Sequence, residues 1–279
     1  MNTKILKNLA YRFRDDDVTA LAAELAYGLL ISFFPMLIFI ITLIGFSSLN
    51  SSEVLLGLSQ ILPSGLFELV KSTIVDVVET RNQNLLSISL ILTIWISSTG
   101  FKAVIKGINR AYSETERRPR IKLEIIAIIC TLALTLMIFM TLALLVLGEL
   151  IGRNLGLYLG HSYEFMVAWN FFRYVIVLSA MIFVFAALYR YTPSRKMTWR
   201  EVMPGAIFAT LGWVAASMFF SFYVNNFENY TNIYGSIGVI IILLTWLFLT
   251  SVIILMGGEV NATLAFDNEG KEKQIGKKH

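Results

Sequence analysis

Six long stretches of this chain contain no Asp, Glu, Lys or Arg, and they constrain the fold more than any other feature. They cover Leu25–Ser52, Asn82–Phe101, Ile125–Gly148, Tyr174–Tyr189, Val202–Phe227 and Asn229–Gly258. A helix needs about 20 apolar residues to cross the hydrocarbon core of a bilayer, and about 17–25 are workable. The fourth stretch reaches that length if the arginines at its ends extend to the membrane surface. The sequence therefore predicts an all-α polytopic membrane protein in which residues 1–279 form a single domain with six transmembrane helices.

Composition and charge placement support this prediction. The chain is 56% hydrophobic and 15% charged, whereas an average soluble domain has about 45–50% apolar and about 25% charged residues. Of the 23 Lys and Arg residues, 19 fall in the two terminal segments and in the second and fourth loops, and 4 fall in the other loops. Because cytoplasmic loops are enriched in Lys and Arg, we expect both termini in the cytoplasm and the first, third and fifth loops outside.

Three segments flank the predicted spans. Residues 1–17 form a cytoplasmic segment in which Lys4–Arg14 is typical of a basic amphipathic helix lying on an anionic leaflet, with Arg12 assigned mostly to its polar side. Three aspartates, Asp15 to Asp17, are candidate N-caps for a first span that begins near Val18. Residues 51–81 have two helical apolar patterns broken by a Pro-Ser-Gly sequence, which predicts two amphipathic helices at the outer face. Residues 265–279 are expected to form a cytoplasmic tail.

The helix of the second span is expected to continue into the cytoplasm. The residues that keep the helical period of 3.6 are Phe101, Ile105, Ile108 and Tyr112. Lys102, Lys106 and Arg110 then fall at i, i+4 and i+8, which places three cations on one helix face. Such a stripe attracts anionic headgroups and sets topology, or it binds a phosphate-bearing lipid or solute specifically.

Several residues can bend or closely pack these helices. Pro35 lies inside the first span and is expected to kink it. Pro204, followed by Gly205, either starts the fifth span proper or kinks it after one turn at the membrane interface. A glycine recurs at every fourth position from Gly148 to Gly160, which favours close helix packing, with a hinge as the alternative.

Polar groups near the span ends are the candidate binding residues. After two glycines, Glu259 and Asn261 are expected to hydrogen-bond the kinked first span or to line a passage. The Tyr234-Gly235-Ser236 sequence predicts a tight entry into the sixth span, or a helix N-terminus whose free amides face an anionic group. Glu24 at the start of the first span either anchors the helix at the interface or lines a polar cleft.

The chain resembles the bacterial YihY/BrkB family along nearly its whole length. The segments that carry the resemblance are Ala22–Tyr27, Leu30–Pro35, Asn109–Tyr112, Arg118-Pro119, Leu188–Pro193, Trp199-Arg200, Pro204–Ala206, Tyr230–Gly238 and Gly257–Ala262. The resemblance implies a six-span inner-membrane protein, and it brings two labels, ribonuclease BN and virulence factor. One departure is Gly28, where the family more often has an aromatic residue, so that looser packing is expected there.

The functional hypothesis that the residues favour is the translocation of a lipid or an amphipathic envelope precursor. No Lys, Arg or carboxylate falls in the middle of a predicted span, which disfavours an ion-driven carrier. The chain has two histidines, His161 and His279, and no metal motif of recognised spacing, so we expect no catalytic residues, metal or cofactor. A membrane scaffold without transport activity and a ribonuclease are the alternatives. The expected partners are membrane lipids and envelope-assembly proteins rather than nucleic acid, and the oligomeric state stays open.

Overall fold

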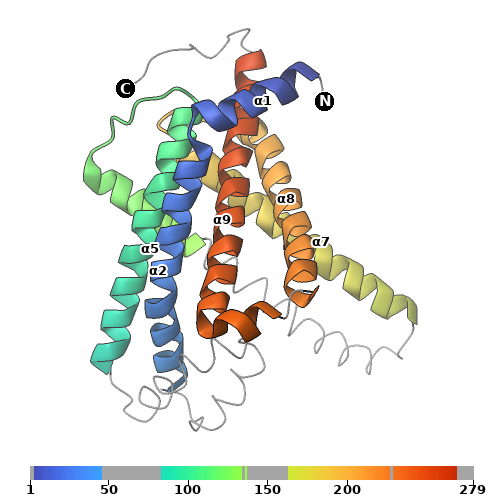
Figure 1. Cartoon of the computed structure of the whole chain (residues 1–279). Helices are drawn as coiled ribbons and strands as arrows, with labels where there is room; N and C mark the ends of the chain where they lie inside the picture. Colours follow the sequence, from blue (N-terminus) through green and yellow to red (C-terminus); the bar gives the residue numbers. More distant parts are fainter. Residues whose placement is uncertain (1–2, 46–82, 134–135, 137–162, 227–228, 269–279) are drawn as a thin grey trace. The chain divides into compact units, whose positions relative to one another are not determined.

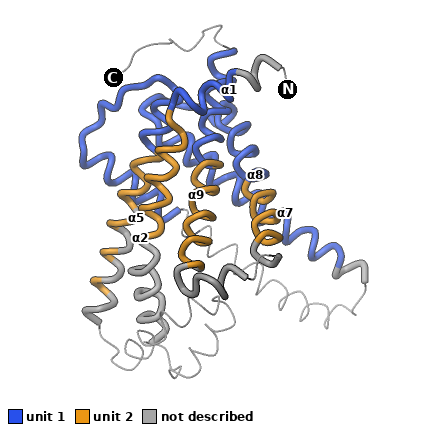
Figure 2. The backbone as a smooth tube through the Cα atoms, viewed as in Figure 1, with its two compact units in different colours: residues 1–16, 105–212, 254–279 blue, residues 17–104, 213–253 orange. Residues whose placement is uncertain are grey.

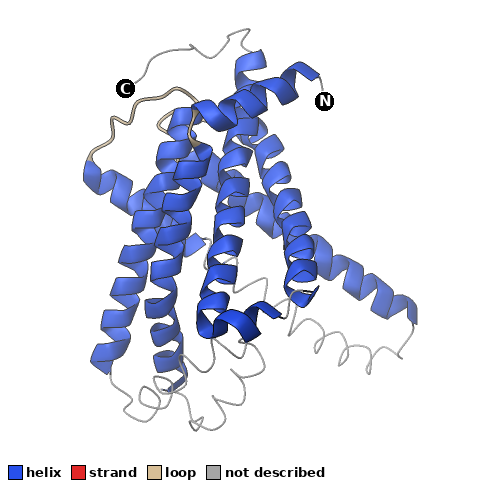
Figure 3. Ribbon diagram, viewed as in Figure 1, coloured by secondary structure: helices blue, strands red, loops and turns tan. Residues whose placement is uncertain are grey.

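The computed structural model describes residues 3–45, 83–133, 136, 163–226 and 229–268 (Figure 1). All regular secondary structure in these ranges is helical (Figure 3). The labelled helices are α1 (Thr3–Asp15), α2 (Val18–Gly45), α5 (Gln83–Ala111), α7 (Tyr163–Tyr191), α8 (Trp199–Asn226) and α9 (Asn229–Asn268). A further helix covers 120–133. The predicted all-α class is therefore confirmed for the part of the chain that the structure describes.

Three of these helices are long and apolar enough to cross a membrane: Val167–Tyr191 in α7, Trp199–Tyr223 in α8 and Ile240–Asp267 in α9. Between 22% and 28% of the residues in their most apolar windows are buried inside the protein. In α2 the described side chains are those of Val18–Ile31, and this part of the helix is apolar. Six spans remain a prediction, and the outer amphipathic segment 51–81 and the glycines of 148–160 lie outside the described residues.

The chain divides into two compact units, each made of segments far apart in sequence (Figure 2). The first unit contains residues 1–16, 105–212 and 254–279, and the second contains 17–104 and 213–253. In the first unit the buried side chains of α5, α7, α8 and α9 include Ile108, Phe185, Tyr189, Val202 and Leu255, and Leu9 of α1 and Ala127 of the helix 120–133 are also buried. The first unit thus joins α1, the end of α5, all of α7, the start of α8 and the end of α9 around one core.

In the second unit, α2 and α5 approach each other at two glycines. A Cβ atom added to Gly28 would lie 2.6 Å from the Cα atom of Gly100, which is closer than real Cβ contacts come. Leu25 and Phe101, next to this contact, are almost completely buried. The expectation that Gly28 loosens the packing is therefore wrong, because the missing side chain is what lets the two backbones meet.

Local sequence signals explain where several helices begin and end. Asp17 adopts a left-handed backbone conformation (φ 51°) between α1 and α2, which an Asp tolerates better than most residues, and α2 begins at Val18 as expected. The predicted buried face of α5 is confirmed, since its apolar residues from Phe101 to Tyr112 are at most 3% exposed. At the start of α8, Glu201 accepts hydrogen bonds from the main-chain N–H and the hydroxyl of Thr198, at 2.7 and 2.8 Å.

The sixth predicted span differs from the observed helix. α9 begins at Asn229 and continues past Gly258 to Asn268, so the segment 234–236 lies inside the helix. Amides at that depth bond to carbonyls four residues earlier. The expectation of a helix N-terminus at these three residues is therefore wrong, and a tight entry into the span stays a prediction. The side chains of Tyr234, Gly235 and Ser236 lie outside what the structure describes.

Candidate functional site

A buried ion pair lies at the centre of the candidate site in the first unit. The Nε atom of Arg12 in α1 donates to Oε2 of Glu259 in α9 at 3.0 Å, and the two side chains are 5% and 2% exposed. A second guanidinium nitrogen of Arg12 donates to the main-chain oxygen of Ala111 at the end of α5. The guanidinium also lies over the ring of Phe266, 5.1 Å from its centroid. Arg12 therefore connects α1 to both α5 and α9.

This pair corrects two expectations. Arg12 points into the protein rather than to the polar side of α1, since its side chain is buried together with those of Leu9 in α1 and of Asp16 directly after the helix. The carboxylate of Glu259 binds Arg12 of α1 rather than the predicted first span. An ionisable residue within a helix apolar enough to span a membrane is costly to bury and is therefore a functional candidate.

The predicted cation Arg110 binds residues at the C-terminal end of α1, the helix that contains Arg12. Its Nε atom lies 3.6 Å from Oδ1 of Asp16, and its Nη2 atom donates to the main-chain oxygen of Asp15 at 3.0 Å. Lys106, one turn earlier in α5, is exposed. Lys102 and Glu24 belong to the second unit, where Glu24 is exposed and Lys102 is partly exposed. Arg110 of the predicted cationic stripe is thus connected to the candidate site.

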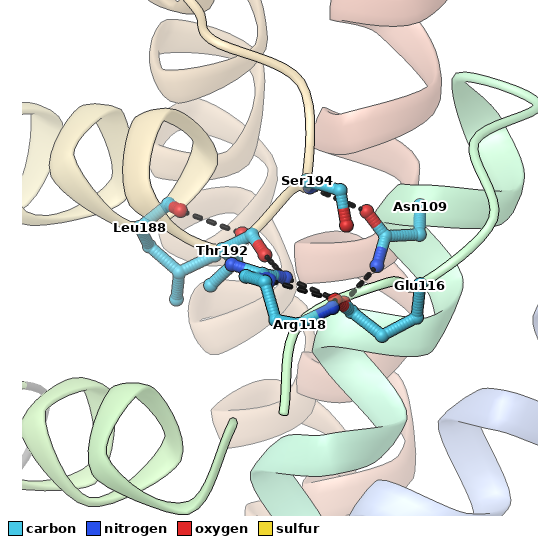
Figure 4. Close-up of polar contacts among 6 residues, drawn as sticks. All are labelled: Asn109, Glu116, Arg118, Leu188, Thr192 and Ser194. Carbon is cyan, nitrogen blue, oxygen red and sulfur yellow. Dashed lines mark hydrogen bonds and ion pairs between the residues drawn. The ribbon is translucent and has the colours of Figure 1, made fainter. Parts of the chain in front are cut away.

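The second part of the site is a polar cluster around Arg118, shown in Figure 4. Arg118 binds both carboxylate oxygens of Glu116, at 2.8 and 2.6 Å, and donates to the main-chain oxygen of Thr192 at 2.7 Å. Asn109 donates to Glu116 at 2.7 Å and accepts from the main-chain N–H of Ser194 at 2.7 Å. These contacts fix the loop after α5 to the turn after α7.

The charge state of this cluster follows from its geometry. Hydrogen bonds from Arg118, which outweigh the effect of partial burial, lower the pKa of Glu116 to about 2. The carboxylate is therefore ionised at neutral pH and serves as an acceptor for both Arg118 and Asn109. Three segments that carry the family resemblance, which contain Asn109, Arg118 and Thr192, meet at this point.

The third part of the site joins α8 to α9 beside Pro204. The side chain of Asn261 accepts from the main-chain N–H of Gly205 at 2.6 Å and donates to the main-chain oxygen of Val202 at 3.2 Å. A Cβ atom on Gly205 would overlap the carbonyl oxygen of Gly257 and the Asn261 side chain. Pro204 lies inside α8, after its first turn. The buried side-chain amide of Asn261 thus binds the α8 backbone on both sides of Pro204. α2 is also helical through Pro35, whose side chain lies outside the described residues.

Tyr112 lies among these groups. Its side chain is 3% exposed, the guanidinium of Arg195 is 5.8 Å from its ring centroid, and charges on Arg12, Glu201 and Glu259 act on its hydroxyl. Burial raises the pKa of Tyr112 above its usual range, so the hydroxyl stays protonated. It has no hydrogen-bond partner among the described residues.

Sequence reasoning found Glu259, Asn261, Gly205 and Arg110 but missed the residues that bind them. The spacing of Leu9 and Arg12 at i and i+3 was an available signal, because it places the charge of Arg12 on the apolar face of α1. For Arg118, the signal was the acidic residue two positions earlier. Within the described ranges, no group of three or more His, Cys, Asp or Glu residues could hold a metal ion.

An architecture that is all-helical in the described residues, with three apolar helices of spanning length among them, defines this chain as a helical membrane protein. It belongs to the virulence factor BrkB family, whose model matches residues 9–279. The chain is 39% identical to the putative ribonuclease-like protein YfkH of Bacillus subtilis, over 93% of this chain and 94% of that protein. It is 28% identical to a UPF0761 membrane protein of Alteromonas mediterranea, over 94% and 88% of the two chains. No solved structure matches it.

Proposed function

We propose that this membrane protein translocates a lipid or a lipid-linked envelope precursor, and that Arg12 and Glu259 form its polar site. The buried ion pair near the end of α9 is the observation that carries the proposal. A lipid phosphate offers a guanidinium the same kind of charged oxygens as a carboxylate does. The headgroup can therefore replace Glu259 at Arg12 during transfer.

The outer surfaces of the same unit suit the apolar part of such a substrate. Large apolar side chains of α7 and α8 are exposed, among them Phe171, Phe172, Ile207 and Leu211. Acyl chains can stay in the bilayer beside these surfaces while the headgroup is bound by polar groups. A fully enclosed ionic pathway is then unnecessary.

The test is transbilayer movement of labelled phospholipids in liposomes that contain the purified full-length protein. We expect a rate clearly above that of empty vesicles, and a reduction of about tenfold for Arg12→Gln, since the loss of one charge-assisted hydrogen bond is about 1.5–3 kcal/mol. Arg14→Gln is the matched control, because Arg14 is an exposed arginine of the same helix. Rates equal to those of empty vesicles for several headgroups would remove the proposal.

If Arg12→Gln does not fold, the double variant Arg12→Gln with Glu259→Gln keeps a neutral hydrogen-bonding pair at the same position.

If the protein is instead a scaffold for envelope assembly, it should capture partner proteins without any lipid movement. The word ribonuclease in the name of YfkH suggests a further control, in which the same preparation is incubated with RNA and Mg²⁺ or Mn²⁺. Our proposal predicts no cleavage above that of a mock preparation.

The proposed orientation keeps both termini in the cytoplasm of a bacterial cell, in the inner membrane. It is supported by the 19 to 4 distribution of Lys and Arg between alternate segments. Reporter fusions at Met1 and at His279 test it. A periplasmic signal from either fusion would contradict the orientation.

A further inference from the structure

Trp199 is the centre of an exposed aromatic cluster in the first unit. It is the first residue of α8, and its ring stacks on that of Phe183 in α7 with centroids 5.6 Å apart and an interplanar angle of 16°. The ring of Tyr191 meets it edge-on at 6.4 Å. Phe183, Tyr191 and Trp199 are 62%, 58% and 38% exposed, so this cluster is a surface and not a core.

The guanidinium of Arg190 lies against these rings. It is 4.8 Å from the ring centroid of Trp199 and 5.6 Å from that of Tyr191. Contact with aromatic faces holds a guanidinium in place while its N–H edges stay available for hydrogen bonds. Among the described residues Arg190 has no carboxylate partner. It is the penultimate residue of the apolar helix Val167–Tyr191, so it is expected at the headgroup level.

An apolar strip on α8 begins at this cation. Trp199, Met203, Ile207 and Leu211 recur at every fourth position and are 38–61% exposed. Residues at this spacing follow one helix face. The twelve residue-to-residue steps from Trp199 to Leu211 make the strip about 18 Å long, slightly more than half of a hydrocarbon core of about 30 Å. A cation at one end of an apolar strip of this length matches a lipid in one leaflet, which has a charged headgroup at one end and acyl chains of about this length.

We infer that Arg190 and Trp199 form a binding site for an anionic phospholipid, with the phosphate at the Arg190 guanidinium and an acyl chain along the strip from Trp199 to Leu211. The local charge favours an anion, since Lys196 in the same segment is exposed. The nearby carboxylate of Glu201 accepts the hydrogen bonds of Thr198 at the start of α8. This site lies on the outer surface of α7 and α8, and it holds a lipid whether or not the protein translocates one.

The experiment measures lipids retained by the purified full-length protein in native mass spectrometry, from an equal mixture of phosphatidylglycerol and phosphatidylcholine. We expect the wild type to prefer phosphatidylglycerol and Arg190→Gln to lose about tenfold of that preference. Arg190→Lys keeps the charge but loses the planar stacking and the paired N–H donors, so its preference should be intermediate. Arg200→Gln, which removes an exposed arginine next to Trp199, is the matched control and should resemble the wild type.

Equal losses in Arg190→Gln and Arg200→Gln would overturn the site, because the preference would then follow total charge. An unchanged preference in Arg190→Gln would overturn it as well. Glycerol 1-phosphate in large excess is a further arm and should not displace the lipid, because it cannot occupy the apolar strip. Displacement by this soluble phosphate would contradict the lipid as occupant. A loss of lipid translocation alone, with the preference intact, bears only on the proposed function.

Discussion

The hydroxyl of Tyr189 in α7 donates a hydrogen bond of 2.7 Å to the main-chain oxygen of Ile254 in α9. Both residues are buried, and the tyrosine ring is completely covered. The contact exists because Gly257, one turn after Ile254, has no side chain to displace the tyrosine. Packing of α7 on α9 in the first unit thus depends on a large residue facing a very small one.

Tyr189→Phe is expected to destabilise the protein by about 0.5–1.5 kcal/mol, because it removes one hydrogen bond and keeps the ring. Tyr189→Ala is expected to cost about 3–5 kcal/mol, since it also leaves a cavity. Reversible unfolding in mild detergent measures both values. Equal values for the two variants would show that the hydrogen bond, and not the ring, dominates the contact.

Gly257→Ala is expected to be strongly destabilising. The added Cβ atom would overlap the Tyr189 hydroxyl and approach the main-chain oxygen of Gly205 to 2.8 Å, and overpacking of this kind costs about 1–3 kcal/mol. Gly258→Ala is the control, because its Cβ atom would meet the flexible side chain of Ile108 at 3.1 Å. Thermal unfolding of the two variants should rank Gly257→Ala well below Gly258→Ala, and the reverse order would contradict the close helix contact.

Removing one member of the buried ion pair should cost more than removing both. Arg12→Leu or Glu259→Leu alone leaves an uncompensated buried charge, with an expected loss of about 3–5 kcal/mol. The double variant Arg12→Leu with Glu259→Leu should lose less than either single variant. A double-mutant cycle on the free energy of unfolding measures the coupling. Additive losses would mean that the two side chains do not interact in the folded protein.

The Arg118 cluster should make stability depend on pH in the acid range. The pKa of Glu116 is about 2 in the folded protein and about 4.3 in an unfolded chain. A lowered pKa stabilises the folded state above pH about 4.3, and this contribution is lost as the pH falls towards 2.

Glu116→Gln should therefore lose stability at neutral pH and depend less on pH between about 4.3 and 2 than the wild type. Near-ultraviolet circular dichroism during acid titration gives the measurement. Glu114→Gln, at an exposed position in the same loop, should titrate like the wild type.

The helices were predictable because their signals are local. Runs without charge marked α7, α8 and α9, and the apolar spacing from Phe101 to Tyr112 gave the buried face of α5 correctly. The Val18 start of α2 followed from the aspartates before it. These features depend on neighbours within a few turns, which a single sequence contains.

The partners within the candidate site were not predictable in the same way. Arg12 and Glu259 are 247 positions apart, and no periodicity relates residues at that distance. The charge-free run ends at Gly258, whereas α9 continues to Asn268, because the paired Glu259 is accommodated inside the helix. Asn261 was a candidate by residue type, but its bonds to both sides of Pro204 depend on the packing of α8.

The amide of Asn261 also determines where α8 can bend. In an isolated helix, a proline removes a backbone hydrogen bond, and the helix bends most easily at the turn around the proline. Here any swing of the first turn of α8 about Pro204 has to break the bonds that Val202 and Gly205 make with α9. The two helices consequently move together near Pro204, and a conformational change that leaves these bonds intact has to bend the protein at other positions.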